Sequence, residues 1–195
     1  MKEELESTDS GPPVRLQLDW RSFLLRPQPS SRPRDPERFV AYTASWQRPR
    51  DEEPTLPFAP WSTAEGPPSH SVPPHCWAKE AHSRGPVDAA EAFHRSLFPA
   101  YFRDHRDITS AAVLADLWRQ AGLEEVDDEQ TFDRAVTEKH EDQVFAEHLE
   151  AAENGASGAP AVRVADGFGV VMGAQRPEVY RRWLERLAAR TAPPD

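Results

Sequence analysis

The stretch GASGAPAVRVADGFGVVMGAQRPEVYRRWLERL, residues 155–187, decides the fold of this chain. Residues 161–165 are mostly apolar and predict a short strand. Asp166-Gly167 is a dipeptide that favours a tight hairpin turn. Residues 168–172 then predict the returning strand. The pattern indicates an antiparallel hairpin.

A helix is predicted directly after the hairpin. Pro177 suits the first turn of a helix, because a missing N–H costs nothing there. Apolar residues at helical spacing define one face of this helix: Tyr180, Trp183, Leu184, Leu187 and Ala188. The C-terminal part therefore predicts a strand–strand–helix unit.

Prolines divide the rest of the chain. Fifteen of the 20 prolines lie in residues 1–86, whereas residues 87–192 hold three. The second part can therefore form long helices. Pro73-Pro74 predicts the start of one helix that ends at Gly85. Thr109 is predicted to cap another helix, with Gly122 just past its end.

Further helices follow from apolar residues at helical spacing. One is defined by the apolar residues Ala90, Phe93, Leu97 and Tyr101. Two separate helices are expected later, one marked by Phe132 and Val136 and the other by Val144, Phe145, Leu149 and Ala152. Asn154-Gly155 predicts the end of the last one.

The N-terminal part predicts one strand. Apolar residues alternate with polar ones at four positions: Val14, Leu16, Leu18 and Trp20. A period of two is typical of a half-buried strand. The stretch up to residue 71 is expected to be mostly loop, with one short helix around residues 37–45.

Several stretches together resemble the DsbA family of thioredoxin-fold oxidoreductases. They are LQLDWRSFLLRP at 16–27, EAFHRSLFPAYFRDHRDIT at 91–109, VLADLWRQAGLE at 113–124, GASGAPAVRV at 155–164 and GVVMGAQRPEVYRRWLERL at 169–187. The similarity is to the cytoplasmic FrnE-like branch, which includes the 2-hydroxychromene-2-carboxylate isomerases. It covers about residues 14–190.

The resemblance implies an α/β fold, thioredoxin-like with an inserted helical domain. Residues 1–71 would form a partial thioredoxin-like half with a proline-rich loop, residues 72–153 the helical domain, and residues 154–192 the C-terminal unit. The family's first strand and CxxC motif have no counterpart before the strand at residue 14, so the sequence is expected to begin inside the first βα unit. Because an open strand edge pairs with other chains, a homodimer formed by strand exchange is possible.

Cys76 is the single cysteine, so the chain has no CxxC pair. Beside His75 and after Pro73-Pro74, it could be a reactive thiol at a helix N-terminus. The favoured interpretation is a small residue on the packed side of a helix. No catalytic residue is therefore predicted.

Ala159 and Pro160 are the candidate binding residues. In the family, the residue before this proline belongs to an X-cis-Pro bond, and its backbone binds peptide or thiol substrates. The resemblance therefore implies a peptide or a small thiol as the substrate at this loop.

Charge narrows the choice of partners. The net charge is −10, and residues 123–153 hold twelve Asp and Glu against Arg134 and Lys139. A nucleic acid or an anionic membrane is not expected as a partner. The start of the chain has no apolar segment typical of a signal peptide, and a single cysteine allows no internal disulfide, so a cytoplasmic location is expected.

No metal site is predicted, because no histidine pair has the i, i+4 spacing together with a third ligand. The histidines are His70, His75, His82, His94, His105, His140 and His148.

Three functions remain open. The first is a protein of the thiol-disulfide oxidoreductase type that is inactive as this sequence stands, because the CxxC is absent. The second is a non-catalytic thioredoxin-like binding module that uses the groove around Pro160. The third is a glutathione-dependent isomerase or transferase with Ser in place of Cys, and only this one calls for glutathione; no other cofactor is expected.

Overall fold

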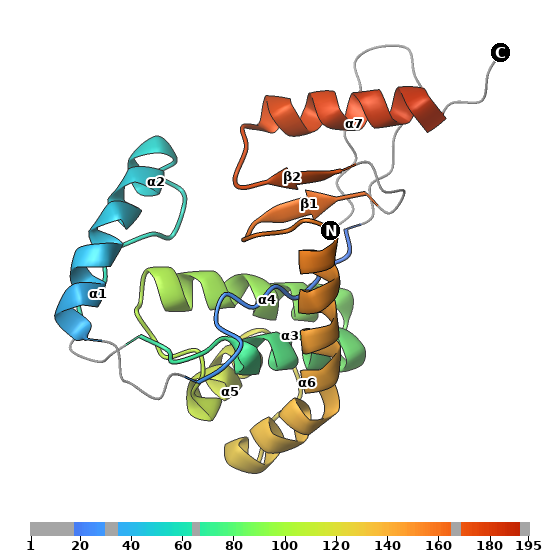
Figure 1. Cartoon of the computed structure of the whole chain (residues 1–195). Coiled ribbons are helices and arrows are strands. Elements are labelled where there is room, and N and C mark those ends of the chain that lie inside the picture. The colour runs from blue at the N-terminus through green and yellow to red at the C-terminus, as the bar shows by residue number, and fades with distance from the viewer. Residues whose placement is uncertain (1–17, 30–34, 64–66, 165–168, 192–195) are drawn as a thin grey trace. The chain divides into compact units, whose positions relative to one another are not determined.

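The computed structural model describes residues 18–29, 35–63, 67–164 and 169–191 (Figure 1). The chain divides into two compact units. A helical unit contains residues 24–148, and a second unit contains the chain before Leu24 and from Leu149 onward.

The helical unit begins with three short elements, α1 (Pro36–Thr43), the 3₁₀ helix η1 (Ala44–Trp46) and α2 (Gln47–Glu52). The helix expected around residues 37–45 is confirmed as α1 and η1. The side chain of Asp35 caps α1 by accepting hydrogen bonds from the backbone N–H groups of Glu37 and Arg38. Phe39 is buried, and its ring lies 5.2 Å from that of Trp61.

Four longer helices form the body of this unit: α3 (Val72–Arg84), α4 (Val87–Phe102), α5 (Ala111–Gln120) and α6 (Glu129–Glu153). Trp77 lies at the centre of their core, with its ring centroid 6.5 Å from Phe93, 5.6 Å from Trp118 and 4.9 Å from Phe132. Edge-to-face and offset ring pairs of this kind stabilise a core beyond their buried area.

The predicted helix ends agree closely with the structure. α3 ends at Arg84 with Gly85 as its C-cap. Gly122 follows the C-cap of α5 with a φ of +77°. Gly155 follows α6 with a φ of +90°. Glycine is favoured at these last two positions because a left-handed backbone costs it no steric clash.

Two predictions for the helices were wrong. Thr109 is not the N-cap of α5; Ser110 is, and the Thr109 hydroxyl donates to Asp107 Oδ1 at 2.6 Å. The two helices expected from Phe132 onward are one continuous helix, α6, which crosses from the helical unit into the second unit. Residues 129–153 contain no glycine or proline, so nothing in the sequence interrupts the hydrogen-bond ladder.

The predicted domain boundary at residue 71 differs from the observed division. The stretch after Leu24 packs with the helical unit. Leu24 lies in the helical core, and Trp61 is 1% exposed. The backbone N–H of Trp61 donates to Thr43 Oγ1 at 2.9 Å. Burial of these apolar side chains gives the proline-rich segment its place in this unit.

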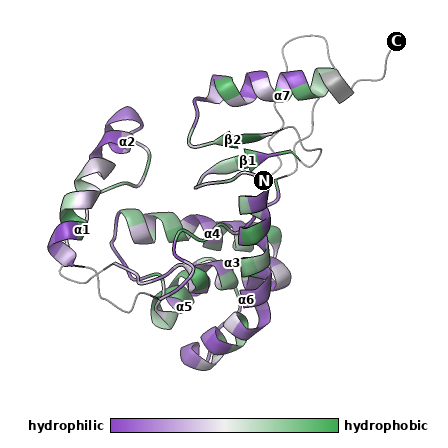
Figure 2. Ribbon diagram, viewed as in Figure 1, coloured by the Kyte–Doolittle hydropathy of each residue, from purple (hydrophilic) through white to green (hydrophobic). Residues whose placement is uncertain are grey.

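The second unit contains the antiparallel pair β1 (Ala161–Arg163) and β2 (Val170–Met172), followed by α7 (Pro177–Thr191). Val162 pairs with Val171 at the centre of the hairpin. The strand–strand–helix order predicted from sequence is confirmed, although the Asp166-Gly167 turn lies outside the described residues. Figure 2 shows hydrophobic residues in β2 and alternating polar and apolar residues along α7.

The predicted N-terminal strand falls mostly outside the described residues, since the description begins at Leu18. Leu18 and Trp20 belong to no strand. Within the described parts of the chain, the sheet therefore consists of β1 and β2 alone.

Candidate functional site

Cys76 lies in the first half of α3, in the core of the helical unit. Its side chain is 0% exposed. Burial, followed by the charges of Glu141 and Asp133, raises the pKa of the Cys76 thiol to about 12. The thiolate is the nucleophilic form of cysteine, so a thiol with this pKa is inert near neutral pH. The structure thus supports the interpretation of Cys76 as a packed core residue.

Ala159 and Pro160 lie in the loop that leads from α6 into β1. Both residues are exposed, and the peptide bond between them is cis. The Pro160 carbonyl accepts a hydrogen bond of 2.8 Å from the backbone N–H of Gly173. This bond extends the pairing of the hairpin by one step and fixes the loop to the residue that follows β2.

The backbone of Ala159 makes no hydrogen bond to any other residue of the described chain. Two side-chain hydrogen bonds hold the end of the hairpin next to this loop. The Tyr180 hydroxyl of α7 donates to the Gly173 carbonyl at 3.2 Å. Gln175 Nε2 donates to the Met172 carbonyl at 2.8 Å. These two bonds tie the end of β2 to α7 and to the segment that precedes it.

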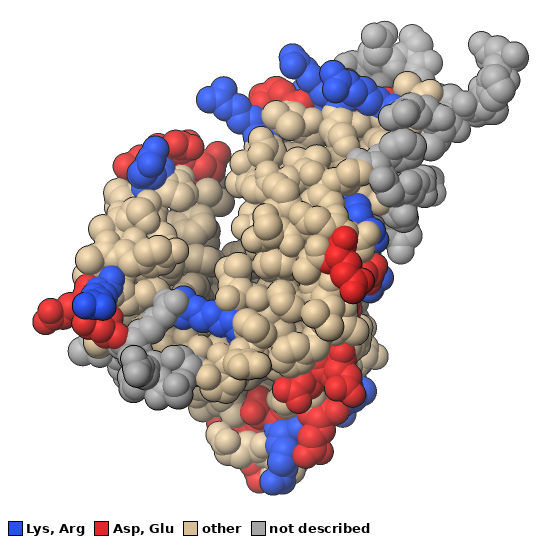
Figure 3. Space-filling model, in the orientation of Figure 1, with Lys and Arg blue, Asp and Glu red and all other residues tan. Residues whose placement is uncertain are grey.

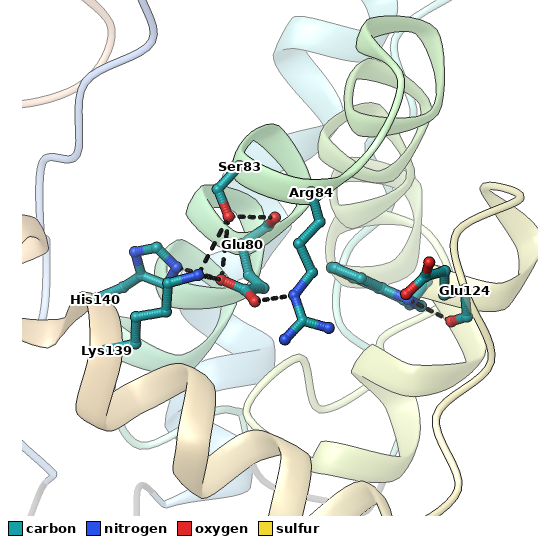
Figure 4. A network of polar contacts seen from close by, with 7 residues as sticks. Glu80, Ser83, Arg84, Glu124, Lys139 and His140 are labelled. Atoms are coloured by element: carbon teal, nitrogen blue, oxygen red, sulfur yellow. Dashed lines mark hydrogen bonds and ion pairs between the residues drawn. The ribbon is translucent and has the colours of Figure 1, made fainter.

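A buried carboxylate joins α3 to α6 in the helical unit (Figure 4). The Glu80 side chain is 1% exposed. Its Oε2 accepts from Lys139 Nζ at 2.7 Å and lies 2.5 Å from His140 Nε2. Arg84, one turn further along α3, pairs with the other oxygen of Glu80.

These basic groups keep Glu80 ionised. Burial alone would raise the pKa of Glu80, but the hydrogen bonds from Lys139 and His140 and the charge of Arg84 outweigh it and lower the pKa to about 2. A carboxylate of such low pKa cannot donate a proton near neutral pH. Glu80 therefore connects two helices and has no role as a general acid.

A second polar cluster lies between α3 and α6. Lys79 Nζ and Glu147 Oε2 are 2.7 Å apart, and both side chains are largely buried. His75 lies nearby, and burial together with the charges of Lys79 and His94 lowers its pKa to about 4. His75 is therefore neutral around pH 7.

A shallow cavity of about 660 Å³ opens where α4 leads into α5. It is lined by Thr63, Asp104, His105, Arg106, Asp107, Ser110 and Val113. Most of its charges already have partners: Arg106 pairs with Asp116 at 2.7 Å, and Asp104 with Arg103 at 2.7 Å. His105 packs its ring on Trp61 at 4.7 Å, which supports the loop.

Most of the acidic residues over 123–153 are exposed, among them Glu138, Glu141 and Asp142 of α6, whereas Glu147 is buried. Figure 3 shows acidic side chains gathered on this part of the surface. In the described residues, no group of three or more His, Cys, Asp or Glu side chains is arranged to hold a metal ion. No helix in those residues has both the length and the apolar character needed to cross a membrane.

Sequence reasoning proposed Ala159 and Pro160 as binding residues but missed both polar clusters between α3 and α6. Glu80 and His140 are 60 residues apart, so no local spacing relates them. The only signal was a Glu within an otherwise apolar helix face. The cavity beside His105 was missed for the same reason, because its lining comes from two separate segments.

A hairpin closed by a C-terminal helix, following a loop with an exposed X-Pro backbone, is the arrangement expected of a thioredoxin-like protein. The family model described as the DSBA-like thioredoxin domain matches residues 1–185. The chain belongs to this family, which is of the thiol-disulfide oxidoreductase type. Comparison with curated proteins and with solved structures gave no match.

Proposed function

We propose that these 195 residues form a DSBA-like thioredoxin domain that binds a peptide or a small thiol at Ala159 and Pro160 without performing thiol-disulfide exchange itself. The observation that carries the proposal is the state of Cys76. A disulfide exchange cycle needs an accessible thiolate and a resolving thiol. The only thiol in this sequence is fully buried, with a pKa raised to about 12.

The open backbone of Ala159 supports the binding part of the proposal. An extended peptide gains affinity when it adds main-chain hydrogen bonds to an exposed edge. The N–H and C=O of Ala159 make no bond to another described residue, and its methyl side chain leaves room for a ligand backbone.

Activity can be tested by dithiothreitol-driven reduction of insulin. The wild-type chain and Cys76→Ala should give the same rate as buffer alone. Turnover of the wild type clearly above that of Cys76→Ala would overturn the non-catalytic part of the proposal.

Binding can be tested by NMR titration with reduced glutathione and with an unstructured peptide that contains one cysteine. Amide shifts should concentrate at residues 159–163. Ala159→Trp should abolish these shifts, because an indole at this exposed position blocks access to the backbone. Ala135→Trp, at an exposed position of α6, is the matched control and should leave them unchanged. Equal shifts in wild type and Ala159→Trp would contradict the assignment of the site.

We also propose that the chain belongs to the FrnE-like branch and acts in the cytoplasm. The stretches at residues 91–109 and 155–164 support the branch. The net charge of −10 supports a partner other than a nucleic acid or an anionic membrane.

A further inference from the structure

The chain passes between its two units at two points, after Phe23 and after His148. The second passage lies inside α6, which continues from Glu129 to Glu153 without a break. The first passage has no regular secondary structure. Leu24, the first residue of the helical unit, is 3% exposed and belongs to its core.

A hydrogen bond joins Leu24 and His148, the first and last residues of the helical unit. The backbone N–H of Leu24 donates to Nδ1 of His148 at 3.2 Å. Nδ1 accepts a hydrogen bond only through its lone pair, so this contact requires a neutral imidazole with its proton on Nε2. An imidazolium ring carries a proton on both nitrogens and cannot accept from Leu24.

Titratable side chains from three helices gather around His75, and His148 is one of them. From α3, His75 interacts electrostatically with His148, and the charge of Lys79 acts on His75. His94 adds a further titratable group from α4. Glu147 is the opposing charge on α6, and its carboxylate is already paired with Lys79 at 2.7 Å. Protonation of His148 would therefore add a positive charge next to Glu147, whose carboxylate is already paired with Lys79.

We propose that the Leu24–His148 hydrogen bond is a pH-sensitive latch: neutral His148 holds the start of the helical unit on α6, and protonation of His148 releases it. The release is local. Two residues further on, the Ser71 N–H donates to the Arg26 carbonyl at 3.0 Å, and this bond involves no titratable group. Acid thus frees the irregular segment around Leu24 while the helices stay in place.

The latch can be tested on the full chain by amide hydrogen exchange, expressed as protection relative to the intrinsic rate at each pH. The ring of His148 is titrated in parallel through its Cε1–H NMR signal. Protection of the Leu24 amide should fall about three- to tenfold as His148 becomes protonated, the loss expected for one hydrogen bond. Protection of the Ser71 amide and of the core amide of Leu114 should not change over the same range.

Two variants separate the roles of the acceptor and of its charge. His148→Asn places an amide Oδ1 near the position of Nδ1 and does not titrate, so Leu24 should stay protected at both ends of the pH range. His148→Ala should lose the protection at every pH. His70→Asn, which replaces a half-buried histidine of the same unit, should behave like the wild type.

Three results would overturn the proposal. The first is Leu24 protection in His148→Ala equal to that of the wild type at neutral pH. The second is wild-type protection that does not change while the His148 signal titrates. The third is a simultaneous loss at Leu24, Ser71 and Leu114, which would be global unfolding.

Discussion

Lys79 of α3 and Glu147 of α6 form an ion pair of 2.7 Å whose side chains are only 15% and 5% exposed. Such a pair has lost most of its hydration, so each charge depends on the other for compensation. The pair therefore fixes α6 against α3 more firmly than an exposed ion pair would.

Removing one partner should be costly. We expect Lys79→Met to lower the free energy of unfolding by about 3 to 5 kcal/mol, because it leaves Glu147 buried without its counter-charge. The double variant Lys79→Met/Glu147→Leu should recover most of this loss. Urea unfolding of the wild type and both variants gives the measurement, and a double variant that is less stable than Lys79→Met would contradict the prediction.

Glu80 should make stability depend on pH in the acid range. Its pKa is lowered from 4.5 to about 2 in the folded chain. A group with a depressed pKa contributes its full stabilisation above pH 4.5 and loses it as the pH falls through 2. The contribution is about 3 kcal/mol, from about 1.4 kcal/mol for each unit of pKa.

Glu80→Gln should therefore flatten the stability profile between pH 4.5 and 2 and lower stability at neutral pH. Glu138→Gln, at an exposed position of the same cluster of helices, is the control and should keep the wild-type profile. Urea unfolding at a series of pH values provides the comparison. A wild-type slope that persists in Glu80→Gln would show that other groups cause it.

Cys76 should resist alkylation in the native state. With a pKa of about 12 and no exposed surface, its thiol should not react with iodoacetamide at pH 8 unless the helical unit opens. Mass spectrometry should show one modified cysteine only after denaturant is added. Rapid modification of the folded chain would contradict the burial of Cys76.

A side chain at Gly85 should be crowded by its neighbours. A Cβ at this position would collide with Leu123 Cδ2 and lie 3.1 Å from the Ala81 carbonyl. We expect Gly85→Ala to lower the free energy of unfolding by about 1 to 3 kcal/mol. Gly158→Ala, where a Cβ would meet open space, is the matched control. Equal stability of the two variants in thermal or urea unfolding would be inconsistent with this close approach.

Local patterns predicted the elements whose signals lie next to each other in the sequence. The hairpin follows from two short apolar runs on either side of Asp166-Gly167, and α7 follows from Pro177 and apolar residues at helical spacing. The ends of α5 and α6 follow from Gly122 and Gly155. The pattern failed inside α6, because the separate apolar groups at Phe132 and Val144 resemble two helices. Only the absence of a helix breaker between them indicates one.

The sequence by itself determined the strand–strand–helix order after Pro160, the positions of most helix ends and the presence of a single thiol. These features depend on backbone preferences and on composition, which act over a few residues. Tertiary structure decided the chemistry of the side chains. The pKa of Cys76 and the ionisation of Glu80 depend on burial and on charges brought from α6, about 60 residues away in the case of Glu80. The same packing joins Leu24 to His148 across 124 positions of the chain, a contact that no local spacing encodes.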